Sequence, residues 1–312
     1  MTAIKIYHAL EELPQGINTA VAMGFFDGVH LGHRQVVSHA VEAARKEGLA
    51  PAVFTFNLPV SSTMKGKRLQ TQEQKYQVME ELGVEYFLEP SFETIAGFSP
   101  REFVEEMMGK LYHARALFCG ENFTFGKKAA GNVEVLRQLC GPLGIQVGVV
   151  PMAEYQGRTV SSTRIRKALE EGEMEQVTAM LGRPYQILFP VVHGQKLGRT
   201  LGMPTINQKY PEGFQIPRLG IYITRVRVNG EWRPSITGLG SRPTVNDDPT
   251  SISCETFIPG YGGNLYDKEV PLEFCRYLEP SHKFENVAQL RQAVMNWADQ
   301  ALSYHGCKKP GE

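Results

Sequence analysis

The chain has 312 residues, of which 42% are hydrophobic and 21% charged, the proportions of an ordinary globular protein. Its 33 Lys and Arg residues balance 33 Asp and Glu residues, so no overall basic field favours a nucleic-acid partner, and no apolar run is long enough to span a membrane. At about 100–200 residues per domain, this length predicts two domains.

Strand-like and helix-like patterns alternate through the first half of the chain. Residues 99–102, Ser-Pro-Arg-Glu, form a capping box with proline at the first helical position, which fixes the start of one helix. The alternation predicts an α/β domain with a parallel sheet covered by helices, and ligands at the carboxyl ends of its strands. The predicted strands are 20–24, 52–56, 84–88, 114–119 and 145–150, and the predicted helices are 31–47, 72–82, 99–111 and 133–139.

The pattern of predicted secondary structure changes after two further helical segments, 162–171 and 173–181. Short β-rich runs separated by Gly, Pro and Asn predict a small, mainly β barrel or sandwich, closed by a helix at 287–304. We place the domain boundary near residue 183, which gives domains 1–183 and 184–312. The predicted strands here are 186–192, 222–228, 235–239, 253–258 and 270–274, and the helix stripe predicted to be core is Val287, Leu290, Val294, Trp297 and Ala301.

The turn at residues 24–33, GFFDGVHLGH, joins the first predicted strand to the first predicted helix. Such a turn directs backbone N–H groups at an anion, helped by the helix dipole. His30 and His33 are three residues apart, on one face of the first helical turn, where imidazoles can stabilise charge that develops as a phosphoryl bond breaks. A tight turn with two surface histidines is the alternative. We favour a nucleotide site because glycines, an aspartate and two histidines are concentrated here.

Two later stretches of the first half carry further candidates. Asn122 offers a donor and an acceptor for a base or a ribose, and Phe123 and Phe125 could flank a ring, although aromatic side chains are more often buried in a core. Residues 160–166, VSSTRIR, place serines where they can cap a helix, and Arg166 one turn later can fold back onto a phosphate. A helix cap with an exposed arginine is the alternative there.

In the second half, residues 194–207 combine a glycine-rich flap with a strand. Thr205 and Asn207 are two residues apart, so on an extended chain they point to the same face. Their hydroxyl and amide oxygens are hard ligands of the kind that Mg²⁺ takes together with water and phosphate. A purely structural role in a β-turn is the alternative.

In order and spacing, these motifs resemble those of the bacterial bifunctional riboflavin kinase/FAD synthetases, over residues 20–305. GFFDGVHLGH looks like the family signature, and its HLGH resembles the His-x-Gly-His element of the nucleotidyltransferase superfamily. Residues 120–126 and 161–166 resemble the second nucleotide motif and the Ser-Ser-Thr-x-Ile-Arg motif, and 194–207 is similar to the flavokinase signature apart from Ile206. The resemblance implies a Rossmann-like nucleotidyltransferase domain followed by a flavokinase-like β-barrel with a terminal helix.

The resemblance implies two reactions, phosphorylation of riboflavin to FMN by ATP and transfer of AMP from ATP to FMN, giving FAD and pyrophosphate. It also implies Mg²⁺ and, as small-molecule substrates, ATP, riboflavin and FMN. The kinase step must deprotonate an alcohol, and Glu255 aligns with the family's base. The runner-up interpretation is an FMN adenylyltransferase alone, with a degenerate flavin-binding second half. A flavin carrier without activity would not need His33, Arg166, Thr205 and Glu255 together.

By resemblance, the catalytic candidates are His30, His33, Arg166 and Glu255, and the metal candidates are the Thr–Asn pair of the flavokinase signature. The expected nucleotide- and flavin-binding residues share these motifs and comprise Gly24, Phe26, Asp27, Gly28, Gly32, Asn122, Phe123, Phe125, Ser161, Ser162, Thr163, Gly194, Gly198, Arg199, Gly202 and Pro204.

The chain departs from the family pattern at a few positions. Asn57-Leu58-Pro59 replaces the usual Pro-His-Pro, for which we expect a rearranged contact to the nucleotide or flavin but not a dead site, and Arg158 is the basic residue nearest to the family's usual basic position at Thr159. In the second half, Phe189 stands where the family mostly has Gly, Gly238 where it often has Asn, and Glu279 where Arg usually precedes Pro.

The five cysteines are widely scattered, with no Cys-x-x-Cys, which predicts reduced buried thiols and neither disulfides nor a zinc site. Residues 1–16 lack the apolar core of a signal peptide. We therefore expect a cytoplasmic enzyme without nucleic-acid or membrane partners. Self-association cannot be read from the sequence.

Overall fold

The structure is a computed structural model that describes residues 3–59, 66–194, 202–241 and 252–308. Its contacts divide the chain into two compact units, the first comprising Met1–Lys65 and Gln72–Ser162, and the second comprising Gly66–Thr71 and Thr163–Glu312. A short segment from the first half of the sequence thus packs with the second unit. Within the described ranges, no helix combines the length and the apolar character that crossing a bilayer requires.

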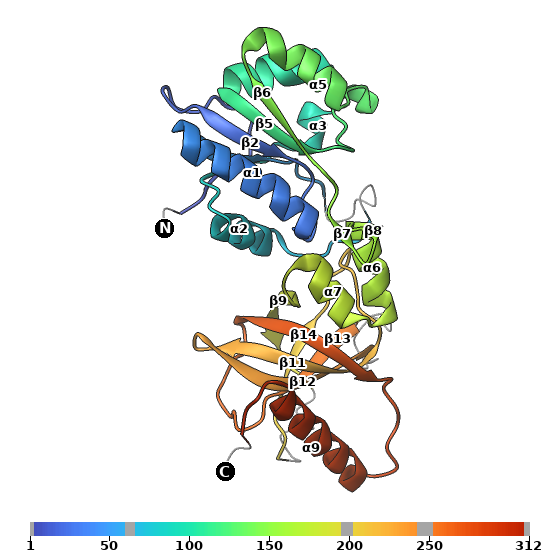
Figure 1. The fold of residues 1–312 in the computed structure, drawn as a ribbon. Coiled ribbons are helices and arrows are strands. Elements are labelled where there is room, and N and C mark those ends of the chain that lie inside the picture. The colour runs from blue at the N-terminus through green and yellow to red at the C-terminus, as the bar shows by residue number, and fades with distance from the viewer. Residues whose placement is uncertain (1–2, 60–65, 195–201, 242–251, 309–312) are drawn as a thin grey trace. The chain divides into compact units, whose positions relative to one another are not determined.

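The first unit contains the predicted parallel sheet (Figure 1). Its six strands lie in the order β1-β4-β3-β2-β5-β6, and every pairing is parallel. Successive connections run outward from β2 on one side and from β5 on the other, so the carboxyl ends of β2 and β5 form a topological switch point. The strands are β1 (Lys5–Tyr7), which the sequence analysis missed, β2 (Thr19–Met23), β3 (Ala50–Phe54), β4 (Tyr86–Leu88), β5 (Ala114–Gly120) and β6 (Gln146–Val150).

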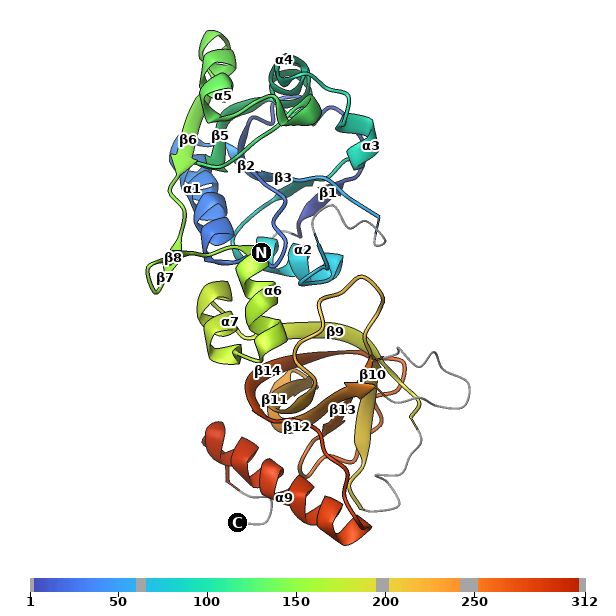
Figure 2. The same ribbon diagram turned by 90° about the vertical axis from the view of Figure 1, so that its right-hand side faces the viewer.

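Helices cover both faces of this sheet (Figure 2). Ala22 of β2 packs with the helices of one face, α1 (Leu31–Glu47) and α2 (Gln72–Glu81), whereas Val21 and Met23 pack with those of the other face. This alternation follows from the two-residue period of a strand, and apolar residues at consecutive positions reflect burial on both faces. The other face is covered by α3 (Phe92–Ile95), α4 (Pro100–Glu102), η1 (Phe103–Leu111) and α5 (Val133–Cys140), with short 3₁₀ turns at η2 (Lys127–Ala129) and η3 (Gly141–Leu143).

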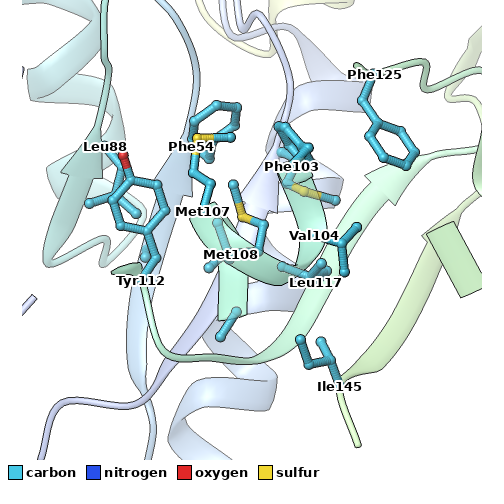
Figure 3. Close-up of a cluster of buried hydrophobic side chains, with 14 of the residues drawn as sticks. Phe54, Leu88, Phe103, Val104, Met107, Met108, Tyr112, Leu117, Phe125 and Ile145 are labelled. Atoms are coloured by element: carbon cyan, nitrogen blue, oxygen red, sulfur yellow. The ribbon is translucent and has the colours of Figure 1, made fainter. Parts of the chain in front are cut away.

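The helix predicted at 99–111 begins with the expected capping box, in which Ser99 accepts from the N–H of Glu102 and the Glu102 carboxylate accepts from the N–H of Ser99. From Phe103 onward it is a π-helix, which ends where Tyr112 N–H donates to the carbonyl of Met107. The wider turns place Phe103, Val104, Met107 and Met108 together in the core, as Figure 3 shows.

The second unit contains a closed six-stranded barrel in the order β10-β13-β12-β11-β14-β9, which resolves the predicted barrel or sandwich in favour of a barrel. Two kinds of element precede the barrel in the chain. The first is a two-stranded hairpin of the first unit, β7 (Glu154–Tyr155) with β8 (Arg158–Thr159), and the second is a pair of helices, α6 (Ser162–Glu171) and α7 (Met174–Leu181). The barrel strands are β9 (Tyr185–Val192), β10 (Thr205–Lys209), β11 (Gly220–Val228), β12 (Glu231–Ser241), β13 (Ile252–Phe257) and β14 (Glu269–Glu279), and α9 (Val287–Tyr304) follows them.

The two faces of the barrel wall differ in chemistry. On one face, the buried hydroxyls of Thr224, Ser235, Thr237 and Thr256 form a chain, with Oγ–Oγ distances of 2.8, 2.9 and 2.8 Å. On the opposite face, Ile236 and Phe257 pack in a separate apolar cluster with α9. Because strand side chains alternate, the neighbours of Thr256 in β13 belong to the α9 face.

The terminal helix lies against the barrel (Figures 1 and 2). Part of the predicted stripe packs in the apolar cluster between them. Trp297 and Ala301 are buried as expected, and Leu290 and Val294 are half-buried. Val287 is 52% exposed, so the prediction that it is core is wrong. The helical period suggested that the first turn of α9 packs against the barrel, but the turn is exposed. A period identifies one face of a helix but not how far the neighbouring element extends along that face.

Glu279, the last residue of β14, forms a hydrogen bond with α9. Its carboxylate accepts a hydrogen bond of 3.1 Å from the indole N–H of Trp297. We expect Glu279→Arg to reduce the free energy of unfolding by about 1–3 kcal/mol, because the largely buried N–H loses its acceptor. Urea unfolding followed by tryptophan fluorescence measures the change. Glu279→Gln retains an amide oxygen and should lose much less, and equal stability of all three proteins would show that this bond contributes nothing.

Candidate active sites

The loop between β2 and α1 is a tight, strained turn. Phe26, Gly28 and Val29 have φ values of 56°, 81° and 39°, in the left-handed region that side-chain-bearing residues rarely adopt. A Cβ atom on Gly24 would lie 3.0 Å from the ring of Phe26, which is buried, so glycine permits this close approach. Strain of this kind concentrates at functional sites, and this loop lies at the topological switch point.

The turn brings His30 and His33 together. His30 is the buried N-cap of α1, and its Nδ1 accepts from the backbone N–H of His33 at 3.4 Å. The two rings stack with centroids 3.6 Å apart and planes inclined by 17°. Gly32 lies beside this pair, since a Cβ there would be in van der Waals contact with the His30 ring at 3.4 Å. Because Nδ1 of His30 is an acceptor, the neutral ring carries its proton on Nε2.

His33 is held as a neutral imidazole. Burial, together with the neighbouring charges of His30 and Lys75, lowers its pKa well below the ordinary value of 6.5. Its Nδ1 is buried and has no hydrogen-bond partner in the part of the chain that the structure describes. A buried polar atom without a partner is costly, so this atom is a strong candidate for contact with a ligand or water.

Other elements hold the carbonyl groups of the same loop. The ammonium of Lys75 in α2 and the hydroxyl of Thr55 donate to the carbonyl of Phe25, at 3.4 and 3.2 Å. The hydroxyl of Ser162, the first residue of α6, donates to the carbonyl of Asp27 at 2.9 Å. Lys75 is buried, and the sequence analysis missed it because a lysine in an amphipathic helix is usually solvated.

The loop after β5 contains Asn122 and lies beside the β2 loop, since β2 and β5 are neighbouring strands. The Asn122 side chain is exposed, and its amide oxygen lies close to Gly120, where a Cβ would be 3.3 Å away. The rings of Phe123 and Phe125 stack 5.8 Å apart and pack with the hydrophobic core, with Phe125 buried. The packing role that we weighed as the alternative is therefore present for both rings.

The Ser–Ser–Thr–x–Ile–Arg motif straddles the two compact units. Ser161 and Ser162 belong to the first, and Thr163 and Arg166 to the second. Nε of Arg166 donates to the carbonyl of Lys67 at 2.7 Å. Arg158, the basic residue closest to the family position, is exposed in the β7–β8 hairpin.

The barrel brings the second set of candidates together. Asn207 lies directly opposite Glu255 in the β10–β13 pair, and Gly238 lies opposite Glu255 in the β12–β13 pair. Directly paired residues share a face, and Thr205, two residues from Asn207, shares it too. This is the α9 face of the wall, not the hydroxyl-lined one. Gly194 approaches Asn207 so closely that a Cβ there would lie 2.5 Å from its amide nitrogen.

A cavity of about 380 Å³ has Thr205 in its lining and also Thr256, which belongs to the hydroxyl-lined face. Pro204 and Thr205 form part of its lining, together with Tyr261, Asn264 and Tyr266 from the β13–β14 connection. Gly202, with φ of +71°, lies just before this strand, whereas Gly198 and Arg199 fall outside the described residues. The cavity combines aromatic, hydroxyl and amide groups, a lining suited to a nucleotide or another polar ring compound.

No group of three or more His, Cys, Asp or Glu side chains in the described chain could hold a metal ion. The metal candidates from the sequence, the hydroxyl of Thr205 and the amide of Asn207, lie on one face of the barrel wall. The five cysteines are free, four of them buried as predicted, but Cys307 is exposed.

Comparison with known protein families divides the chain as its motifs do. The family model described as FAD synthetase matches residues 13–164, and the model described as riboflavin kinase matches residues 181–305. The first range contains both loops at the switch point, and the second contains the whole barrel and α9.

Similar proteins extend over nearly the full chain. The bifunctional riboflavin kinase/FMN adenylyltransferase of Listeria monocytogenes is 35% identical over 280 residues, 88% of each chain. The proteins of the same name from Bacillus subtilis and Escherichia coli K12 are 30% and 28% identical, covering 96% and 99% of this chain and 95% and 100% of their own. A crystal structure titled as a macrolide-efflux protein from Streptococcus pneumoniae has a TM-score of 0.84 at 24% identity, over 96% of this chain and 98% of its own, which shows the shared fold.

The lowered pKa of His33 predicts a pH dependence of stability. Unfolding restores an ordinary pKa near 6.5, so below that pH the unfolded chain binds a proton that the folded chain excludes. The stabilisation by the neutral ring is therefore complete above pH 6.5 and is lost as the pH falls towards the folded-state pKa. Below pH 6.5 we expect wild type to lose up to about 1.4 kcal/mol per pH unit more than His33→Gln.

Urea unfolding at several pH values between 7.5 and 5.5 measures this difference. His39→Gln is the matched control, because His39 lies on the same helix with an exposed side chain, and its curve should run parallel to wild type. Parallel curves for wild type and His33→Gln would contradict the assignment of a neutral His33 ring in the folded protein.

Proposed function

Because this chain belongs to the bifunctional riboflavin kinase/FMN adenylyltransferase family, we propose that its two reactions take place at the two sites described above. The protein phosphorylates riboflavin to FMN with ATP, and transfers AMP from ATP to FMN, giving FAD and pyrophosphate. Matches to both family models disfavour an adenylyltransferase with a degenerate second half.

We propose 1–183 and 184–312 as the functional domains, supported by family matches that end at 164 and begin at 181.

We assign adenylyl transfer to the loops after β2 and β5. The phosphate of FMN is already anionic, so the reaction needs positioning and charge stabilisation but no side-chain base. His30 and His33 would hydrogen-bond the ATP phosphates as neutral rings, which the lowered pKa of His33 supports. Positive charge would then come from Lys75, which lies beside the loop, and from Arg166.

The remaining first-half candidates have shaping and binding roles in this proposal. Asn122 would contact the base or ribose from the neighbouring loop, and Ser161, Ser162 and Thr163 would contact the leaving pyrophosphate with Arg166. The loop residues that would shape the binding site for the ATP phosphates are Gly24, Phe26, Asp27, Gly28 and Gly32. Positive φ values support Phe26 and Gly28, a close approach supports Gly24, and the hydrogen bond from Ser162 supports Asp27.

We assign riboflavin phosphorylation to the α9 face of the barrel wall. Glu255 would accept the proton of the riboflavin hydroxyl, because a carboxylate is the one basic group among the candidates there. Thr205 and Asn207 would hold Mg²⁺, and the fit is supported by their shared face and their oxygen donors. The ion, when bound, neutralises charge on the ATP phosphate oxygens.

The cavity beside Thr205 is our candidate for the kinase nucleotide. Its aromatic side chains and the amide of Asn264 suit a base, and Thr205 connects it to the proposed metal pair. Pro204 and Gly202 would shape its entrance, with Gly194, Gly198 and Arg199 in the flap that the signature predicts.

The single observation that carries the proposal is the stacked His30–His33 pair in the loop at the topological switch point. In this pair the buried Nδ1 of His33 has no hydrogen-bond partner among the described residues. Incubation with riboflavin, ATP and Mg²⁺, with FMN and FAD resolved over time, tests both activities. Formation of FMN followed by FAD is expected, and formation of neither would overturn the assignment.

The cytoplasm as the compartment, and the absence of nucleic-acid and membrane partners, remain part of the proposal. Free thiols at all five cysteines fit a reducing compartment, and equal numbers of basic and acidic residues give no electrostatic support for a polyanionic partner.

His33→Ala should lower FAD formation by a factor of order 10²–10³, as for the loss of one preorganised donor. Riboflavin phosphorylation should be almost unchanged, because Glu255, Thr205 and Asn207 belong to the other compact unit. Separate assays of the riboflavin-to-FMN and FMN-to-FAD steps measure this. A comparable loss of kinase activity would argue against the partition of the two reactions.

Glu255→Gln separates the two chemistries in the opposite direction. The variant retains shape and hydrogen-bonding reach but lacks the basic carboxylate, so we expect most riboflavin-to-FMN conversion to disappear and FMN-to-FAD conversion to persist. A thermal melt identifies any loss of folding. Full kinase activity in a folded Glu255→Gln protein would show that another group is the base.

A further inference from the structure

The segment Gly66–Thr71 lies far from the barrel in sequence but packs in its compact unit. The N–H of Arg68 donates to the carbonyl of Gly213, and the N–H of Gln215 donates to the carbonyl of Arg68, both at 2.8 Å. These two hydrogen bonds form a parallel bridge around Phe214. The segment therefore has a defined backbone position, set by the connection between β10 and β11.

The same segment holds Arg166. The carbonyl of Lys67 accepts from Nε of Arg166 at 2.7 Å, and Gly66, with φ of +75°, comes so close that a Cβ would lie 3.3 Å from the guanidinium carbon. A hydrogen bond at Nε fixes the plane of the guanidinium, which is otherwise free to rotate on a long side chain.

A second contact secures α6 one turn later. The buried amide of Gln215 donates to the carboxylate of Glu170 at 3.1 Å. Arg166 and Glu170 are four residues apart and lie on one face of the helix. That face is therefore held at two points, by Lys67 and by Gln215, and these two residues are joined through Arg68.

The barrel core supports this arrangement. The hydroxyl of Tyr185 in β9 donates to the carbonyl of Gln215 at 3.2 Å. Phe214 packs edge-on against Phe189, with ring centroids 5.4 Å apart and planes inclined by 79°. Phe189 is one of the departures from the family pattern, which mostly has glycine there. A glycine at this position would leave Phe214 without this ring contact.

We propose that Gln215 is a positioning residue for adenylyl transfer, which acts through Glu170 and the Gly66–Thr71 segment to orient the guanidinium of Arg166. This inference rests on the proposed function of Arg166 at the pyrophosphate. Preorganisation of a charged group lowers the barrier only where that group contacts the reacting phosphates, so the effect should be specific to adenylyl transfer.

The test compares Gln215→Ala and Glu170→Ala with wild type. Each should lower kcat/KM for FMN-to-FAD conversion by about tenfold, less than the roughly 10²-fold that a misplacement of 1 Å can cost. In the reverse reaction, in which FAD and pyrophosphate give FMN and ATP, the KM for pyrophosphate should rise. Riboflavin phosphorylation and the melting temperature should change little.

Two further variants exclude a merely structural role. Glu170→Gln retains an oxygen that accepts from Gln215 and should restore most of the activity. Glu171→Ala removes a neighbouring carboxylate that pairs with the exposed Lys167 at 3.7 Å, and it should leave both reactions unchanged. Equal losses in Glu170→Ala and Glu171→Ala would overturn the proposal.

Arg166→Ala separates failure of this inference from failure of the proposed function. If Arg166→Ala leaves adenylyl transfer intact, the role of Arg166 is wrong and the inference falls with it. If Arg166→Ala is impaired but Gln215→Ala is not, only the positioning role is wrong. In the double variant, Gln215→Ala should add less than about twofold to the loss in Arg166→Ala, and multiplicative losses would overturn the positioning role.

Discussion

The turn between β2 and α1 is the constraint on which the first unit depends. Its left-handed backbone at Phe26, Gly28 and Val29 leaves carbonyl groups that no regular element can satisfy. Donors from three other parts of the chain satisfy them, namely Thr55 after β3, Lys75 in α2 and Ser162 at the start of α6. The same turn presents the stacked histidines, so the polar groups that stabilise the strained backbone also define the chemistry of the site.

In the barrel, the corresponding constraint is strand alternation. The residues of β13 face alternately towards the hydroxyl chain that contains Thr256 and towards the α9 face that contains Glu255. A one-residue shift in register would exchange these environments and separate Glu255 from Asn207. The same shift would move Thr256 away from Thr237, so the hydroxyl chain and the proposed kinase site depend on one register.

The departures from the family pattern have structural partners in this chain. Phe189 packs against Phe214, Gly238 lies opposite Glu255, and Glu279 accepts from Trp297. Glu279 therefore contributes to the docking of α9, which gives the carboxylate a role in stability at a position where the family usually has arginine. Asn57, just beyond the carboxyl end of β3, forms a parallel bridge with Ser91: its N–H donates to the carbonyl of Pro90 and its carbonyl accepts from the N–H of Phe92.

The sequence by itself determined the alternation of strands and helices, the parallel sheet, the capping box at Ser99 and the motifs from which both reactions follow, because periodicity and local hydrogen bonding act over a few residues. It could not predict the burial of Lys75, the neutral state of His33 or the exposure of Val287, since these depend on what packs against a helix face and how far it extends. Only the tertiary structure placed Glu255 opposite Asn207 and Lys67 beside Arg166, because register and long-range hydrogen bonds join residues whose separation along the chain carries no periodic signal.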